Sequence, residues 1–498
     1  MNVNPITRLD YPDPDVIRVE DTYYMVSTTM HFMPGCEILQ SFDLVNWEHV
    51  TYVYETLDHT DAQQLKSGQN IYGQGMWAAS LRYHEGRFCI CFVANDTRKT
   101  YLYTSEKIDG PWKKQLIEGF YHDGSLLFDE DGRNYIVYGN DEIWITELNE
   151  DLTAPKKDGL HRLLVSDHKN PELGYEGSHI QKINGYYYIF LIHSLRDRWM
   201  RTEACFYSDS LEGEFTGGDV LCDDRGYCGQ GVAQGGIVDT PDGKWYAMLF
   251  QDSGAVGRIP ILLPVTWKDH FPFFGQNGHV PEEIEVHSTR PGYIYQPLVG
   301  SDDFCNGLLP RWQFNHDPDP RYYHLDALQG TYTITTREVC TELTQAVNTL
   351  TQRMSYPSCA AEVTVDASAL KEGDVAGLCA LQGCYAAVGI TKHHGKYEVL
   401  MLDKKEDGIL DMTEGTVVES HQMDFRLEAD FCNMKDEARC YYRVNKGDWL
   451  PIGTVHKLYF KLDHFTGCRF GLFCYAAEET GGSACFRDFK YYDVDEIS

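Results

Sequence analysis

The sequence predicts an all-β protein: a five-bladed β-propeller followed by a two-sheet antiparallel β-sandwich. Two observations carry this prediction. A turn dipeptide followed by a short aromatic or β-branched run recurs five times in the first 300 residues, and the rest of the chain consists of short alternating segments without helical periodicity. The length of 498 residues also exceeds what one hydrophobic core usually organises, so more than one domain is expected.

The five-fold repeat is marked by one aromatic residue after each turn. Asp-Gly or Asn-Gly, a strong hairpin signal, precedes three of the five runs. Repeats of roughly 40–60 residues are typical of four-stranded propeller blades. We therefore expect residues 1–298 to form the propeller. The marker residues are Tyr24, Phe88, Tyr135, Tyr187 and Trp245.

The sequence changes in character near residue 300. Residues 297–301 (PLVGS) have the composition of a linker. Beyond them, alternating segments such as 360–365, 385–390 and 468–473 are separated by turn residues. This pattern is typical of a two-sheet antiparallel sandwich, which we expect to occupy residues 299–498.

The net negative charge of the chain makes some classes of binding partner unfavourable. Its 75 acidic and 43 basic side chains give a formal net charge of −32. Such a chain repels phosphate backbones and anionic lipid surfaces, so neither nucleic acid nor a membrane is an expected partner. A neutral substrate fits better. The aromatic content of 13% suits strands and also surfaces on which flat rings stack against sugars.

The sixteen cysteines are expected to be reduced thiols, mostly buried. The first residues, 1–5, have neither a basic nor an apolar region of the kind that directs export, and no run of about 18 apolar residues is present. The sequence contains no paired CxxC array of the kind that binds zinc. We expect a cytoplasmic protein, although a mature chain without its leader would have the same sequence.

The first chemically distinctive residue is Asp13, which lies between Pro12 and Pro14. Proline fixes its own φ and favours extended geometry in the residue before it. A side chain held in this way is aimed in advance, which a carboxylate acting as a base requires. The alternative is a proline-stiffened turn that leads into the strand at 16–18.

Two further acidic residues occupy matching places in other blades. Asp123 and Glu176 each lie beside Gly and Ser and lead into an apolar strand. The inner strands of a propeller converge on a central channel, so these carboxylates and Asp13 are expected to meet there. Glycoside hydrolysis needs one protonated acid and one ionised carboxylate. A third carboxylate would raise the pKa of the acid by repulsion between like charges.

Six short motifs together resemble glycoside hydrolase family 43. Within it, the chain is similar to β-xylosidases and α-L-arabinofuranosidases that have a C-terminal concanavalin A-like sandwich. The resemblance extends over essentially the whole chain and implies a five-bladed propeller of inverting exo-enzymes. The motifs are Asn4–Pro5, Pro12–Asp15, Met76–Ala79, Asp123–Ser125, Tyr175–Ser178 and Gly257–Pro260.

The resemblance also implies a role for each site residue. Asp13 is the general base that activates water, and Glu176 is the general acid. Asp123 orients the acid and adjusts its pKa. Trp77 lies against the sugar in the innermost subsite, and Arg258 contacts the sugar hydroxyls.

Several aromatic residues could extend the pocket. Phe32, with Met30 and Met33, is expected to contact substrate, with core packing as the alternative. Trp312 and Phe314 could let the sandwich wall off the pocket, with an ordinary contact between domains as the alternative.

One position departs from the family pattern. Many members have a histidine on the channel axis, often beside a bound Ca²⁺, where this chain has Gln234. An amide oxygen can bind Ca²⁺, but it can equally hold ordered water. We therefore expect no required cofactor, with Ca²⁺ at Gln234 as the open alternative.

The resulting hypothesis is an exo-acting inverting glycosidase. It would release terminal β-D-xylose, α-L-arabinofuranose or both from xylo-oligosaccharides or arabinoxylo-oligosaccharides derived from xylan. One alternative is a retaining propeller glycosidase similar to a fructofuranosidase. A second is a carbohydrate-binding protein without activity. Assembly into a homo-oligomer is left open.

Overall fold

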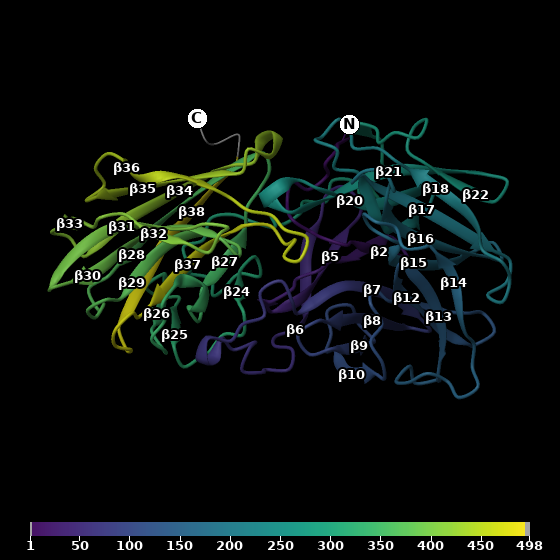
Figure 1. The fold of residues 1–498 in the computed structure, drawn as a ribbon, viewed down its shortest axis with the longest axis horizontal. Helices are drawn as coiled ribbons and strands as arrows, with labels where there is room; N and C mark the ends of the chain where they lie inside the picture. The colour runs from purple at the N-terminus through teal and green to yellow at the C-terminus, as the bar shows by residue number, and fades with distance from the viewer. Residues whose placement is uncertain (1, 494–498) are drawn as a thin grey trace.

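The computed structural model describes residues 2–493, which form two β-rich domains lying side by side. In Figure 1 the propeller runs from purple to teal and the sandwich from green to yellow. The only helical segments among the described residues are four single 3₁₀ turns: η1 (Lys66–Gly68), η2 (Gly254–Val256), η3 (Leu343–Gln345) and η4 (Cys432–Met434). The all-β prediction is confirmed.

Five four-stranded antiparallel sheets form the propeller. Each of the five aromatic markers lies on the second strand of its own sheet, which confirms the predicted repeat. The sheets are β2 (Asp15–Val19), β3 (Thr22–Val26), β5 (Gly35–Ser41) and β6 (Glu48–Tyr54); β7 (Met76–His84), β8 (Arg87–Ala94), β9 (Lys99–Ser105) and β10 (Lys113–Ile117); β11 (Ser125–Phe128), β12 (Asn134–Asn140), β13 (Glu142–Leu148) and β14 (His161–Ser166); β15 (Glu176–Ile183), β16 (Tyr186–Ser194), β17 (Arg201–Ser208) and β18 (Thr216–Leu221); and β19 (Val232–Asp239), β20 (Trp245–Asp252), β21 (Arg258–Lys268) and β22 (Phe271–Phe274).

The innermost strands close into a ring. Going around, β2 contacts β7, β7 contacts β11, and the series continues through β15 and β19 back to β2. The N-terminal segment helps to join the ends, because β1 (Asn2–Val3) pairs with β23 (Glu283–Ile284) and the side chain of Asn4 bonds Leu262 of the fifth blade. Closure brings the starts of all five inner strands to one end of the channel.

Two antiparallel sheets form the sandwich, as predicted. The first contains β4 (Phe32–Met33), β24 (Gln313–Asn315), β27 (Leu350–Arg353), β37 (Arg469–Tyr475), β29 (Val375–Leu381), β30 (Tyr385–His393), β31 (Lys396–Lys404), β32 (Leu410–Met412) and β33 (Thr416–Val418). The second contains β25 (Tyr323–Asp326), β26 (Thr331–Thr335), β38 (Ser483–Asp493), β28 (Ser358–Asp366), β34 (Gln422–Asp430), β35 (Glu437–Val444) and β36 (Leu450–Lys457).

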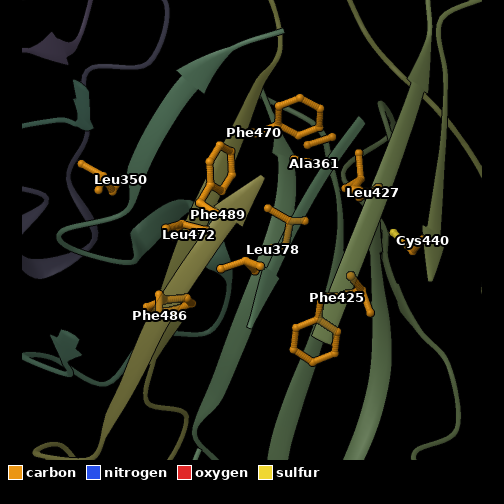
Figure 2. Packing of buried hydrophobic residues seen from close by; sticks show 14 of the residues in the cluster. Leu350, Ala361, Leu378, Phe425, Leu427, Cys440, Phe470, Leu472, Phe486 and Phe489 are labelled. Atoms are coloured by element: carbon orange, nitrogen blue, oxygen red, sulfur yellow. The ribbon is translucent and has the colours of Figure 1, made fainter. Parts of the chain in front are cut away.

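The core of the sandwich lies between these two sheets. Leu378 and Leu472 of the first sheet and Phe425 and Phe486 of the second belong to one buried cluster (Figure 2). Truncating a buried leucine in such a core typically costs about 2–5 kcal/mol. Ala255 and other residues of the fifth blade belong to the same cluster, so the two domains share part of one core.

The domains also share a sheet. β4 belongs to the first blade by sequence, but Phe32 and Met33 pair with β24 at the edge of the sandwich. Trp312 and Phe314 are buried in the sandwich core and do not line the pocket, whereas Phe314 pairs with Met33, so the alternative of an ordinary contact between domains describes Phe314. The boundary predicted between residues 298 and 299 stays a prediction.

All sixteen cysteines are free thiols, and most of them are buried, as expected. Within residues 2–493, no helix has the length and apolar character needed to span a membrane.

Candidate active site

Irregularities in three inner strands aim side chains at one end of the channel. The pairing register shifts between Met76 and Ala79 in β7, between Glu176 and His179 in β15, and between Ala233 and Gly236 in β19. A bulge interrupts the alternation of side chains and redirects those within it. The same level of the channel therefore receives Trp77, Glu176 and Gln234.

Asp13 has a backbone conformation different from the expected one. Its φ is +52°, whereas a residue before proline was expected to be extended. A positive φ in a residue other than glycine costs of order 1–3 kcal/mol and is found at functional sites. The carbonyl of Pro12 accepts hydrogen bonds from the main-chain N–H of Thr28 and the hydroxyl of Ser27, which hold the turn in place.

Both carboxylate oxygens of Asp13 are held. Oδ1 accepts a hydrogen bond from Arg258 Nη1 at 2.7 Å, and Oδ2 accepts one from the hydroxyl of Thr28 at 2.5 Å. The residue is 3% exposed. A carboxylate has about four lone-pair sites, so Asp13 can still accept a proton from water.

Asp123 and Glu176 both lie near the same ring nitrogen of His122. The Nε2 atom of His122 is 3.6 Å from Asp123 and 3.5 Å from Glu176. Asp123 Oδ2 accepts the main-chain N–H of Gly177 at 3.1 Å, and Glu176 Oε2 accepts a hydrogen bond from the side-chain amide of Asn140 at 2.7 Å. These contacts fix how the two carboxyl groups point.

Burial and charge shift the pKa values at this site. Burial, helped by the charges of Glu176 and Asp13 and opposed by His122, raises the pKa of Asp123 to about 6. The charge of Asp123 in turn raises the pKa of His122 to about 9, against the effect of burial. His122 is therefore protonated at neutral pH.

The pKa of Glu176 shifts in the direction opposite to the expected one. Burial alone would raise it, but His122 and the guanidinium groups of Arg201 and Arg258 hold it below its ordinary value. The sequence-based expectation of a raised pKa took only neighbouring carboxylates into account, whereas three cations lie close to Glu176. When no sugar is bound and Asp123 and Glu176 share one proton, the proton therefore lies more often on Asp123. The two groups titrate together rather than independently.

Two arginines supply the positive charge of the pocket. Arg258 Nε and Arg201 Nη1 lie 3.2 and 3.1 Å from the two oxygens of Asp252. Nε of Arg201 is buried without a hydrogen-bond partner, and burial lowers the pKa of Arg201 to about 10. Arg201 was not predicted from the sequence, since nothing near it forms a recognisable motif.

The carboxylates line a small pocket of about 80 Å³. Six of the seven predicted site residues lie in its wall: Asp13, Trp77, Asp123, Glu176, Gln234 and Arg258. The wall also contains residues that were not assigned to it: His122, Leu173, Trp199, Arg201, Leu462 and Phe465.

The sandwich closes this pocket through the segment between β36 and β37, the yellow loop that reaches toward the propeller in Figure 1. The ring of Phe465 is 5.1 Å from that of Trp77 in a T-shaped arrangement, and the guanidinium carbon of Arg258 is 3.6 Å from the Phe465 centroid. An aromatic and cationic wall is thus shared between the two domains. Sequence patterns do not mark Phe465, because its contacts depend on how the domains meet.

Two family models match the chain. The model of "Glycosyl hydrolases family 43" matches residues 3–272, and that of the "Beta xylosidase C-terminal Concanavalin A-like domain" matches residues 301–492. The chain belongs to glycosyl hydrolase family 43. It is therefore a glycoside hydrolase, and its sandwich is of the concanavalin A-like type.

Several known proteins are similar to this chain over nearly its whole length. A β-xylosidase of Formosa agariphila is 27% identical over 99% of this chain and 89% of its own length. A xylosidase/arabinosidase of Humicola insolens is 25% identical over 98% of this chain and 96% of its own. A solved structure of a bifunctional GH43-CE protein of Bacteroides eggerthii is 42% identical to this chain, with a TM-score of 0.92. The match covers all of this chain and 64% of the length of that structure.

Phe32 does not lie in the pocket of this family 43 enzyme. Its ring packs against the guanidinium of Arg469, 3.4 Å from the centroid, where β4 joins the sandwich. The predicted contact with substrate is therefore wrong for Phe32. The core-packing alternative describes its position.

Gln234 is the one donor assigned to a possible Ca²⁺ site, and Ca²⁺ binding there stays a prediction. Gln234 offers one neutral oxygen, and its main-chain N–H donates to Glu203. Among residues 2–493, the one set of His, Cys, Asp and Glu side chains close enough to hold a metal ion is His122, Asp123 and Glu176, which lie in the same pocket wall as Gln234. Ca²⁺ takes six to eight oxygen ligands, usually with carboxylates among them.

Proposed function

We propose that this family 43 enzyme releases terminal β-D-xylose, and also α-L-arabinofuranose, from xylo-oligosaccharides and arabinoxylo-oligosaccharides. The observation that carries the proposal is a small pocket in which three carboxylates lie beside the aromatic side chains of Trp77, Trp199 and Phe465. A pocket of this size suits one terminal sugar rather than the middle of a chain. The names of the relatives, β-xylosidase and xylosidase/arabinosidase, support these two sugars.

The proposed reaction inverts the anomeric carbon. Asp13 takes a proton from a water molecule, which attacks the sugar, while Glu176 gives a proton to the leaving oxygen. Arg258 and Thr28 hold the base in position for this attack. Asp123 holds the main chain next to Glu176 and so orients the acid.

Substrate binding is expected to shift Glu176 toward its protonated form. In the free site the surrounding cations keep the pKa of Glu176 low. A sugar in the pocket displaces water from Glu176 and brings no charge of its own. Desolvation disfavours a charged carboxylate, so binding favours the protonated form that can act as an acid.

Catalysis is proposed to need no metal ion. Arg201 and Arg258 supply positive charge that offsets the carboxylates, and the Gln234 side chain offers a single neutral oxygen to a cation. Dialysis against a chelator, followed by elemental analysis and assay, is expected to leave activity unchanged. Loss of activity that added Ca²⁺ restores would contradict this proposal.

The substrate proposal is tested with a panel of nitrophenyl glycosides. We expect hydrolysis of the β-D-xyloside and the α-L-arabinofuranoside, with xylobiose as the natural control. A preference for a fructofuranoside, or binding without hydrolysis, would favour the alternatives, which family membership does not support. Cytoplasmic location and self-association stay predictions.

A further inference from the structure

Asp10 lies three residues before the catalytic base, at the junction of the two domains. Its side chain is buried, with 2% of the residue exposed. Oδ1 accepts the main-chain N–H of Arg258 at 2.7 Å, and Oδ2 accepts the main-chain N–H of Gly467 at 2.8 Å. No cationic side chain donates a hydrogen bond to this carboxylate, so its two main-chain donors are its direct partners within the described chain.

Each of the two donors belongs to a different part of the pocket. Arg258 holds the base Asp13 through its guanidinium group. Gly467 follows two residues after Phe465, the aromatic wall that the sandwich contributes. The main chain of Asp10 itself runs on to Asp13. The Asp10 carboxylate therefore links Arg258, which holds the base, to the sandwich segment that carries Phe465.

The packing around this carboxylate leaves no space for other side chains. A Cβ added at Gly257 would lie 2.1 Å from Asp10 Oδ1, and one at Gly467 would lie 2.0 Å from the carbonyl oxygen of Val256. Gly257 also has a φ of +101°, which favours glycine. The two glycines let the main chains of both domains approach Asp10 closely.

The sandwich holds the main chain of the same segment. Arg353 Nε donates to the carbonyl of Asp10 at 2.9 Å, and Arg353 Nη1 lies 2.8 Å from Oε2 of the buried Glu37. Next to it, Leu9 forms a β-bridge with Ser355. Residues of both domains thus hold Asp10, so a change in how the domains pack would move Asp10 and the residues bonded to it.

We propose that Asp10 is a positioning residue for hydrolysis. It contacts neither the substrate nor the reacting atoms, but it sets the Phe465 wall and the Arg258–Asp13 pair in one arrangement. The inference rests on the proposed function, because it assumes that Asp13 acts as the base. A displacement of about 1 Å in such a site can cost about 100-fold in rate.

The test uses Asp10→Asn in the full-length protein. Asparagine keeps the shape of the side chain but has one acceptor oxygen, so one of the two N–H groups loses its partner. The matched control is Asp374→Asn. Asp374 is another buried aspartate whose carboxylate accepts a main-chain N–H, from Lys371 at 2.8 Å, but it lies within the sandwich away from the pocket.

Three measurements decide the outcome. Asp10→Asn is expected to lower kcat by about 10- to 100-fold, equally on nitrophenyl xyloside and xylobiose, while Asp374→Asn keeps kcat within about two-fold. In a double-mutant cycle with Phe465→Ala, the effect of Asp10→Asn should be smaller than in the parent, since both changes release the same wall. Amide hydrogen exchange should rise for peptides covering 253–259 and 462–469 in Asp10→Asn alone.

The inference and the proposed function can fail separately. A wild-type enzyme that cleaves neither glycoside would overturn the proposed function, and hydrogen exchange would still test the structural link. If wild type is active but Asp10→Asn matches Asp374→Asn in kcat and exchange, the inference is overturned alone. Additive effects of Asp10→Asn and Phe465→Ala would also overturn it.

Discussion

Glu176, the proposed general acid, and Asp123, which is proposed to orient it, are joined through one main-chain N–H. Gly177, which follows Glu176, donates this N–H to Asp123 at 3.1 Å, so Asp123 fixes the backbone from which Glu176 projects. The side chain of Glu176 is then held by Asn140. These contacts support the separate roles proposed for the two neighbouring carboxyl groups.

Replacing the acid should affect substrates according to their leaving groups. Glu176→Ala is expected to lower kcat on xylobiose by about 10²–10⁴-fold, because proton transfer to a poor leaving group is lost. The effect on a nitrophenyl xyloside, whose phenol leaves without help, should be less than about ten-fold. Asp13→Ala is the control, and it should be severe on both substrates. Equal losses with Glu176→Ala would show that Glu176 is not the acid.

The raised pKa of Asp123 predicts that this residue lowers stability at neutral pH. Its pKa rises from 3.8 to about 6 on folding, so the folded protein binds this proton more tightly than the unfolded chain. The free energy of unfolding then falls as pH rises from about 4 to about 6, and stays lower above that range. At pH 7.5 the uncharged Asp123→Asn should be more stable than wild type by up to about 3 kcal/mol.

Denaturant unfolding of both proteins at pH 7.5 and pH 5 measures this difference. We expect it to shrink at pH 5, because wild-type Asp123 is then largely protonated. A difference that is absent at pH 7.5, or larger at pH 5, would contradict the assigned shift.

At the scale of elements, the loop between β36 and β37 belongs to the active site. Phe465→Ala removes its ring contacts with Trp77 and Arg258. We expect kcat/KM on xylobiose to fall by about ten-fold, since an aromatic contact of this kind contributes about 0.5–1.5 kcal/mol beyond its buried area. The melting temperature should also fall, because Phe465 is buried, so the kinetics are measured well below the unfolding transition. Steady-state kinetics that match wild type would show that the loop does not form the pocket wall.

The elements differ in how well the sequence predicts them. The blades follow from local signals, since turn dipeptides and aromatic runs act within one hairpin. The bulges in β7, β15 and β19 and the positive φ of Asp13 are not visible in that way. They are maintained by contacts with other blades, as when Thr28 holds Asp13. The carboxylates were therefore found from their motifs, while their exact aim was not.

At the scale of the whole molecule, the two predicted domains behave as one structural unit. β4 extends a sheet of the sandwich, and Ala255 of the fifth blade packs into the sandwich core. The fold of each domain was predictable from its own pattern. The placement of Phe32, Arg201 and Phe465 was not, because it depends on residues that are distant in the sequence.

The central claim is that Asp13 activates water for a single inverting displacement. Proton NMR of the sugar released from a β-xyloside, recorded within the first minutes, measures it most directly. The proposed mechanism predicts that α-xylose appears first and then equilibrates with the β-anomer. Initial release of β-xylose would mean retention through a covalent intermediate, and would contradict the role assigned to Asp13.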